Sequence, residues 1–168
     1  MSRTTDGLPP LLIALGHPFR SDDAAGPKVL EAVRERQPGS FEFVHHSGDP
    51  SDLIDLWAGR DVLIVDAARL DDDAAAIAIS GPFGDGSATD DDVVARLEDG
   101  GGAVTSSHAL SLAEALELGR VLGRLPDSMT IVAVAGQDFR FGEGLTPRAA
   151  RGVAEASQWI VGRFRDAG

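Results

Sequence analysis

Residues 11–39 read LLIALGHPFRSDDAAGPKVLEAVRERQPG, and the fold class can be worked out from this stretch. The apolar run 11–15 lies between Pro10 and Gly16, which is typical of a strand buried on both faces. Apolar residues then recur at helical spacing, at Val29, Leu30 and Val33, until the pair Pro38–Gly39 ends the pattern. A buried strand followed at once by an amphipathic helix predicts the first unit of an α/β protein.

The next residues repeat this alternation of strand and helix. FEFVHH predicts a second strand at residues 41–45, and DPSDLIDLWAGR predicts a short helix. Leu53, Leu56 and Trp57 would form the apolar face of that helix. VLIV then predicts a third strand at residues 62–65, closed by Asp66. This order indicates a largely parallel sheet with helices on both faces.

The pattern weakens between residues 71 and 102 and returns after them. We expect a short edge strand at residues 76–80 and a mobile loop in the charged, turn-rich stretch 81–92. Ser111 and Glu114 have the spacing of a capping box, so a helix is expected to begin near Ser111. Leu112, Leu116 and Gly119 would share one of its faces. TIVAVAG predicts a buried strand at about residues 130–135, and a last helix follows with Pro147 in its first turn.

Composition narrows the class of protein. A chain of 168 residues is expected to form one domain, residues 1–168, with a sizeable core, and we expect a monomer. The net charge of −12 argues against a nucleic-acid partner. There is no cysteine, which excludes disulfides, thiolate catalysis and thiolate metal sites. We find neither an apolar signal core nor a run long enough to span a membrane, so a cytoplasmic protein is the expectation.

Acidic and histidine residues follow the predicted strands. Asp22 and Asp23 come after the first strand, Asp66 ends the third, and His108 lies in the polar turn TSSHALS. In an open parallel sheet these loops meet at the carboxyl edge, where ligands bind. Two carboxylates and an imidazole are suitable ligands for a divalent metal ion.

Structural interpretations compete with this one. One aspartate of the pair could cap the following helix, and Asp66 could be a polar strand end in a turn. His108 could be an ordinary loop histidine. His45 and His46 are adjacent in a strand and should point to opposite faces, which makes a shared metal difficult. The phosphate-binding motifs GxGxxG and GxxxxGK[ST] and the nucleophile elbow GxSxG are missing.

Taken in order, several of these motifs resemble one family. LLIALGHPFRSDDAAGP is similar to the opening of the nickel-hydrogenase maturation endopeptidases, which have a pattern like GN-x-L-x-x-DDG-x-G. The resemblance continues through VLIVDA, SSHALSLAEALEL, TIVAVAG and GLTPRA, and is weakest at residues 71–102. It implies a three-layer α/β/α sandwich with a mainly parallel, five-stranded sheet.

The resemblance also implies a function. Members of this family remove a C-terminal extension from the precursor of the nickel-iron hydrogenase large subunit after nickel insertion. Carried over, the family's ligands fall on Asp23, Asp66 and His108, which would meet the nickel of the substrate. The nickel would be both the recognition signal and a Lewis acid near the scissile carbonyl. No tightly bound cofactor of the protein's own is then expected, and Asp22 would cap the helix or support the site.

Departures from the family pattern keep alternatives open. His17 replaces the family's asparagine, and Ser21 and Ala24 replace glycines, so a side chain at Ala24 restricts the backbone beside Asp23. His17 is also a candidate extra ligand. One alternative is a non-catalytic chaperone or checkpoint module that recognises a metalloenzyme precursor. Another is a small metal-dependent amide hydrolase that holds its own metal.

Overall fold

The computed structural model describes residues 7–70, 73–82, 104–105 and 108–164. The predicted order of strand and helix is present at the start of the chain. β1 (Leu11–Leu15) is followed by a short 3-10 helix, η1 (Ser21–Ala24), and by α1 (Ala25–Arg36). β2 (Glu42–His46), α2 (Pro50–Trp57) and β3 (Asp61–Leu70) come next. The second half contains β4 (Ala76–Pro82), β5 (Val104–Thr105), α4 (Ala109–Leu122), β6 (Ser128–Ala135) and α5 (Pro147–Arg163).

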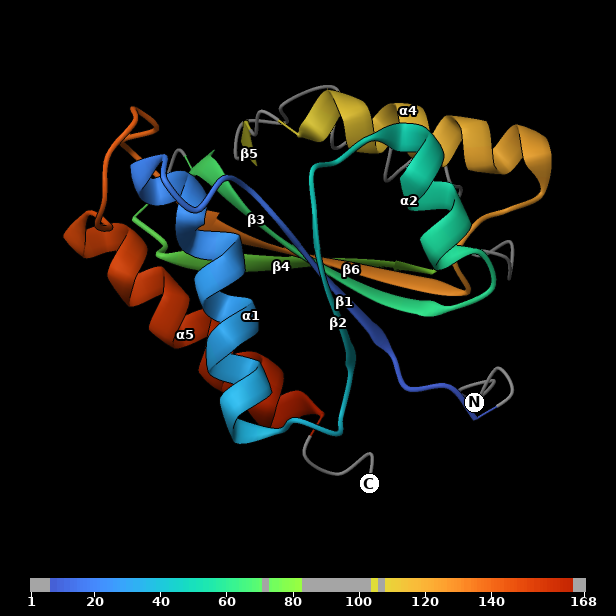
Figure 1. The fold of residues 1–168 in the computed structure, drawn as a ribbon, viewed down its shortest axis with the longest axis horizontal. Coiled ribbons are helices and arrows are strands. Elements are labelled where there is room, and N and C mark those ends of the chain that lie inside the picture. Colours follow the sequence, from blue (N-terminus) through green and yellow to red (C-terminus); the bar gives the residue numbers. More distant parts are fainter. Residues whose placement is uncertain (1–6, 71–72, 83–103, 106–107, 165–168) are drawn as a thin grey trace.

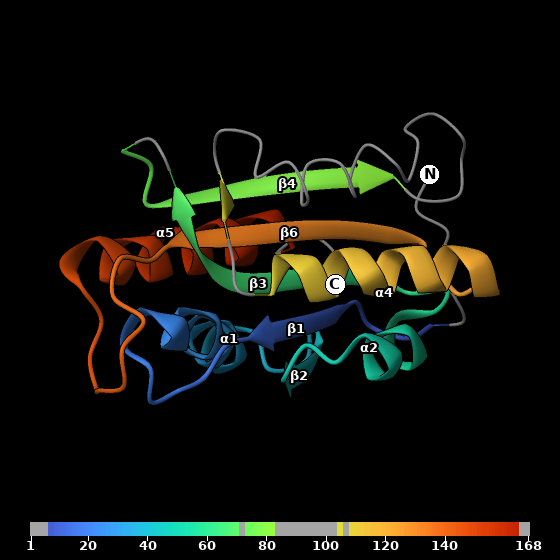
Figure 2. The same ribbon diagram turned by 90° about the horizontal axis from the view of Figure 1, so that it is seen from above.

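The main sheet has the strand order β2-β1-β3-β6-β4, and the two-residue β5 pairs with β3 beside it. All neighbours in the row are parallel except β4, which runs antiparallel to β6 at the edge. Figure 2 shows this row from above, with β4 along one edge and β2 along the other. The mainly parallel five-stranded sheet and the edge strand are therefore confirmed. The structure extends this strand to Pro82, and the rest of the loop expected at residues 81–92 lies outside the described residues.

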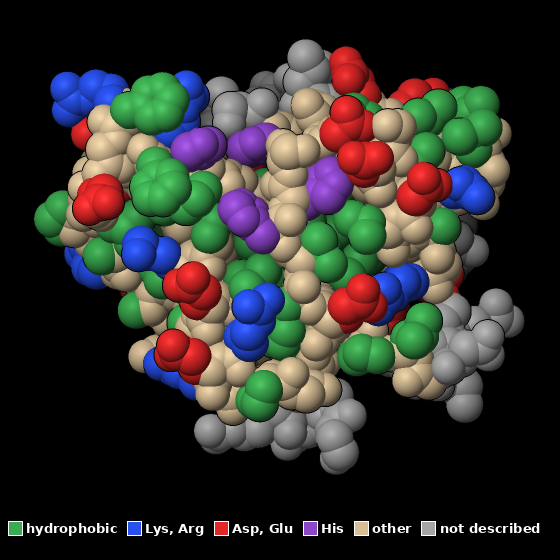
Figure 3. All heavy atoms as spheres, in the orientation of Figure 1, with side chains coloured by type: hydrophobic (Ala, Val, Ile, Leu, Met, Phe, Trp, Pro, Cys, Tyr) green, Lys and Arg blue, Asp and Glu red, His purple; other side chains and the backbone are tan. Residues whose placement is uncertain are grey.

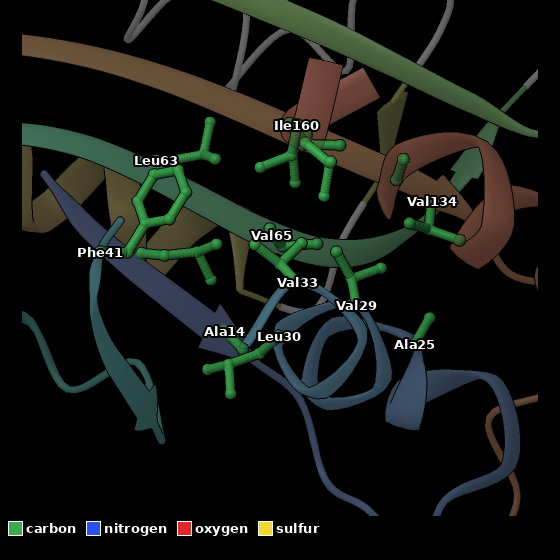
Figure 4. Packing of buried hydrophobic residues seen from close by; sticks show 14 of the residues in the cluster. Ala14, Ala25, Val29, Leu30, Val33, Phe41, Leu63, Val65, Val134 and Ile160 are labelled. Atoms are coloured by element: carbon green, nitrogen blue, oxygen red, sulfur yellow. The ribbon is translucent and has the colours of Figure 1, made fainter. Parts of the chain in front are cut away.

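Helices cover both faces of the sheet, which gives the expected three layers. Figure 1 shows α1 and α5 on one side and α2 and α4 on the other. On the α1 side, apolar residues of the helices pack against inward-facing strand residues, as Figure 4 shows. On the α2 side, Trp57 is fully buried and its ring N–H donates to the carbonyl of Arg124 at 3.1 Å. Leu53 is buried as expected, while Leu56 is partly buried against the same core.

Several other predicted boundaries were wrong. β3 does not close at Asp66 but runs on to Leu70, because residues 66–68 pair with β6 and Arg69 and Leu70 pair with β5. α4 begins at Ala109, two residues before Ser111, with His108 in the N-cap position. Since Ser111 lies inside the helix, the Ser111–Glu114 spacing is not a capping box. β2 lies one residue later than predicted, at Glu42–His46.

Within the described residues, no helix is long and apolar enough to cross a membrane.

Candidate active site

The turn after β1 brings the backbone of Asp23 into close contact with Gly16, the residue that follows the strand. Gly16 has a φ of +120°, and a Cβ atom there would lie 2.0 Å from the carbonyl oxygen of Asp23. Only glycine therefore allows this close approach. The backbone N–H of His17 donates to Asp23 Oδ2 at 2.8 Å. The other oxygen, Oδ1, is buried and has no hydrogen-bond partner among the described residues.

Asp66 and His108 reach the same place from the sheet and from α4. β1 pairs with β3 only as far as Val65, so Asp66 is the first β3 residue beyond this pairing. His108 does not cap α4 with its side chain but turns its Nδ1 towards Asp66, at 3.1 Å from Oδ2 and 3.2 Å from Oδ1. Gly48 leaves room for the imidazole, since a Cβ there would lie 3.1 Å from His108 Cδ2.

The three predicted site residues therefore meet. Asp23, Asp66 and His108 each offer a ligand atom, and these atoms lie within 4.8 Å of one another. Asp23 and Asp66 are 7% and 5% exposed, so their carboxyl groups are largely shielded from water. The hydrogen bond to Asp66 is the main cause of a raised pKa of His108, with further attraction from the charges of Asp66 and Asp23 and opposition from burial. The donor set and the unpartnered Asp23 Oδ1 suit a divalent cation brought to this point.

A cavity of about 500 Å³ opens beside the cluster. All four histidines of the chain line it, and Figure 3 shows the histidines gathered on one face of the molecule. His45 lies 2.7 Å from the carbonyl of Gly16 through its Nε2, and His46 accepts a hydrogen bond from the N–H of Gly48. Among the described residues, neither belongs to a group of three candidate metal ligands.

His17 lines the cavity without joining the cluster. Its Nδ1 accepts from the N–H of Phe19 at 3.1 Å, and its ring packs edge-on against Phe19 and Phe141. Within the described part of the chain it is not one of the candidate ligands. Its contribution to the site is the backbone N–H that holds Asp23.

Asp22 does not cap a helix, so that interpretation of the pair was wrong. Its side chain is fully buried and accepts four hydrogen bonds from the loop that joins β6 to α5. The donors are the N–H groups of Gln137, Asp138 and Thr146 and the hydroxyl of Thr146, at 2.7–3.1 Å. α1 begins without a side-chain cap at Ala24. Asp22 therefore fastens this loop to η1, directly beside Asp23.

The restriction expected at Ala24 is not seen, and the unusual backbone conformation lies at Ser21 instead. Ala24 has φ −75° and ψ −4°, which any residue adopts, so its methyl group restricts nothing. Ser21 has the left-handed φ of 49°, unusual for a side chain larger than hydrogen. Its N–H donates to the carbonyl of Gly142 and its hydroxyl to that of Arg140. These contacts hold the unusual conformation in place.

Sequence analysis missed Arg20 and Phe141, which also line the cavity. Phe141 comes from the loop between β6 and α5, more than a hundred residues from Arg20. The available signal was the stretch GQDFRFGEGLT, which places two aromatic residues among turn formers and charges.

Comparison with known proteins finds a relative that matches most of the chain. The hydrogenase 2 maturation protease of Escherichia coli strain K12 is 26% identical over 160 residues, which are 94% of this chain and 92% of that protein. The chain is similar to the hydrogenase maturation proteases. No family model matches it. The resemblance found in the sequence motifs thus extends over nearly the whole chain.

Solved structures show the same fold. The hydrogenase maturating endopeptidase HybD of Escherichia coli has a TM-score of 0.70 at 22% identity, with 96% of this chain and 94% of that chain covered. The [NiFe] hydrogenase maturation protease HybD of Thermococcus kodakarensis has a TM-score of 0.69 at 20% identity, with 94% and 99% covered. The fold class is therefore that of the maturation proteases.

Proposed function

We propose that the protein is an endopeptidase of hydrogenase maturation, which removes the C-terminal extension of a nickel-iron hydrogenase large-subunit precursor after nickel insertion. The observation that carries this proposal is the meeting of Asp23, Asp66 and His108 beside an open cavity. The whole-length similarity to a hydrogenase 2 maturation protease supports the class of reaction.

The nickel belongs to the substrate in this proposal. Asp23 has a buried carboxylate oxygen with no partner among the described residues, so a cation at this point would receive this ligand without breaking a hydrogen bond of that oxygen. Asp66 orients the imidazole of His108 through Nδ1. The substrate's nickel would identify a loaded precursor and polarise the scissile carbonyl as a Lewis acid. His108 can bind it only as the neutral imidazole, so binding would compete with protonation of the ring.

A cleavage assay tests the function directly. The purified protein is incubated with nickel-loaded precursor and, in parallel, with nickel-free precursor, and the large subunit is followed by gel mobility and mass spectrometry. We expect shortening of the loaded precursor alone. Equal cleavage of both forms would contradict recognition through nickel. A stable complex without shortening would instead favour the non-catalytic checkpoint module.

The Asp23→Asn variant tests the ligand assignment. Asparagine keeps an oxygen that can accept from the N–H of His17, so the fold should persist. It loses the negative charge that a cation needs. We expect processing to fall by more than about a hundredfold, because residues that merely support metal ligands already cost about tenfold to a hundredfold. Full processing by a folded Asp23→Asn protein, with folding checked by a melting curve, would rule out this role.

A further inference from the structure

The segment before η1 and the loop between β6 and α5 are joined by hydrogen bonds at the edge of the cavity, which Arg20 and Phe141 line. The N–H of Gly142 donates to the carbonyl of Phe19 at 2.9 Å, and the N–H of Ser21 donates back to Gly142 at 3.1 Å. The N–H of Asp22 donates to the carbonyl of Asp138 at 2.8 Å, and the buried Asp22 carboxylate holds the same loop. These bonds hold together the backbone of the two segments.

The two segments carry solvent-exposed aromatic rings. Phe19 is 58% exposed and Phe141 is 73% exposed, and the ring of His17 lies 6.0 Å from each of them, measured between centroids. Isolated exposed apolar residues are ordinary, but a cluster at the mouth of a cavity is typical of a binding surface. Since the backbone beneath is fixed, a ligand would meet these rings already in position.

Arg20 adds a positive charge to the same edge of the cavity. Its guanidinium carbon lies 4.4 Å from the centre of the Phe141 ring, which holds the side chain over the ring face. Among the described residues Arg20 has no carboxylate partner, although the chain carries a net charge of −12. A guanidinium group held on an aromatic ring and free of such a partner is well suited to bind a carboxylate.

We propose that Phe19, Arg20 and Phe141, together called the aromatic rim, bind a peptide segment of the substrate that carries a carboxylate next to an apolar side chain. The carboxylate would bind Arg20, and the apolar side chain would pack against the two phenylalanine rings. This inference rests on the proposed function, which makes the occupant a peptide of the precursor. The cavity then separates charges: Asp23 and Asp66 face a cation, while Arg20 at the mouth faces an anion.

Short peptides test the rim without any cleavage. The probes are acetyl-Leu-Glu-Leu-amide, its Gln counterpart and its Lys counterpart, titrated into ¹⁵N-labelled protein while the Arg20 Nε–H signal is followed by NMR. We expect the Glu peptide to shift this signal and the signals of residues 19–21 and 140–142. Arg20→Gln should weaken binding of the Glu peptide by about fivefold, as for an exposed ion pair.

Arg69→Gln is the matched control. Arg69 also lies over a phenylalanine, at 5.2 Å from the centre of the Phe139 ring, but it lines a separate cavity. This variant should bind the Glu peptide as the wild type does. Equal binding of the Glu and Gln peptides would overturn the carboxylate assignment, and shifts centred on Arg69 would overturn the location.

Cleavage kinetics separate this inference from the function on which it rests. With nickel-loaded precursor, Arg20→Gln should raise KM severalfold and leave kcat unchanged, because the rim binds substrate without touching the reacting bond. A wild-type protein that cleaves normally, together with an Arg20→Gln variant of unchanged KM, would overturn the rim alone. A wild-type protein that binds the Glu peptide at the rim but never shortens the precursor would overturn the proposed function alone.

Discussion

Asp22 and Asp23 are neighbours in sequence, yet their carboxylates have opposite surroundings. Asp22 accepts four hydrogen bonds and is fully buried. Asp23 keeps one buried oxygen that has no partner among the described residues, and it lies at the cavity. The first arrangement stabilises a loop, and the second leaves capacity for a ligand. The division of roles therefore follows from the hydrogen bonds that each residue already makes.

Asp22→Asn should lower the stability of the protein. In asparagine an NH₂ group replaces one of the two carboxylate oxygens, and an NH₂ group cannot accept a hydrogen bond from an N–H. Depending on which oxygen is replaced, the N–H of Thr146 or those of Gln137 and Asp138 lose their acceptor. Buried donors left unpaired should cost roughly 2–3 kcal/mol of unfolding free energy. We expect a melting temperature lower by about 4–12 °C for a chain of this size. The matched Asp23→Asn variant should melt near the wild type, and the opposite ranking would contradict this division of roles.

His108 should make stability depend on pH through its contact with Asp66. The pKa of His108 is raised above its ordinary 6.5, mainly by the hydrogen bond to Asp66. A raised folded-state pKa means that the protonated pair stabilises the fold fully below pH 6.5, and that this contribution is lost as pH rises through the folded pKa. Melting curves in chelator should therefore show wild type and His108→Gln converging as the pH rises from about 5 to about 9. A difference in melting temperature between the two proteins that stays constant over this pH range would contradict the stabilising contact between His108 and Asp66.

The convergence of the three candidate residues could be foreseen from the sequence, whereas the anchoring role of Asp22 could not. The parallel arrangement of β1 and β3 places the turn that carries Asp23 near Asp66, where β3 continues past its pairing with β1. The hydrogen bonds of Asp22 join residues 115–124 positions apart, across a loop whose conformation no local pattern specifies. Long-range contacts of this kind become visible only in the folded chain.

Strand ends were less predictable than strand existence. Residues 67–70, AARL, lack the β-branched residues that favour strands, yet pairing with β6 and β5 extends β3 through them. Similarly, Ser111 has good capping chemistry, but α4 begins earlier because His108 stands at its start and faces Asp66. Tertiary contacts therefore decide where β3 ends and where α4 begins, and both boundaries lie near the candidate site.

The start of α1 packs closely against the end of β1 and the middle of β3. A Cβ atom at Gly26 would lie 2.3 Å from the carbonyl oxygen of Leu15 and 2.8 Å from that of Val65. Gly26→Ala should force the helix away from the sheet, cost about 1–3 kcal/mol of stability and slow processing by displacing η1 with Asp23.

Gly162→Ala in α5 provides the control for this change. Among the described residues, no atom apart from its chain neighbours and the backbone of its own helix lies within 4 Å of the added Cβ there, so the variant should gain about 0.5–1 kcal/mol from helix propensity. Melting curves of both variants, with cleavage assays, check the pair. A Gly26→Ala protein that gains stability as Gly162→Ala does would show that the packing of α1 against β1 and β3 does not require glycine at position 26.

At the scale of the whole molecule, the ligand types available in the chain bear on whether the protein or its substrate would supply a metal ion. The chain has no cysteine, so thiolate, the strongest protein ligand for a borderline metal, is missing. The remaining cluster has two carboxylates and one imidazole, and His108 is already engaged with Asp66. A cation would compete with protonation of His108 and would find only these few ligands, unless the substrate supplies more.

We accordingly expect the protein purified without added metal to contain little tightly bound metal. Its two carboxylates and raised-pKa histidine would hold an isolated ion weakly, whereas a precursor that carries nickel brings the rest of the coordination with it. Elemental analysis by mass spectrometry measures the content, and the Asp23→Asn protein gives the background from adventitious surface binding. One tightly held zinc ion per wild-type chain, absent from the variant and required for cleavage, would mean that the enzyme supplies its own metal. The nickel of the precursor would then no longer be needed to complete the site.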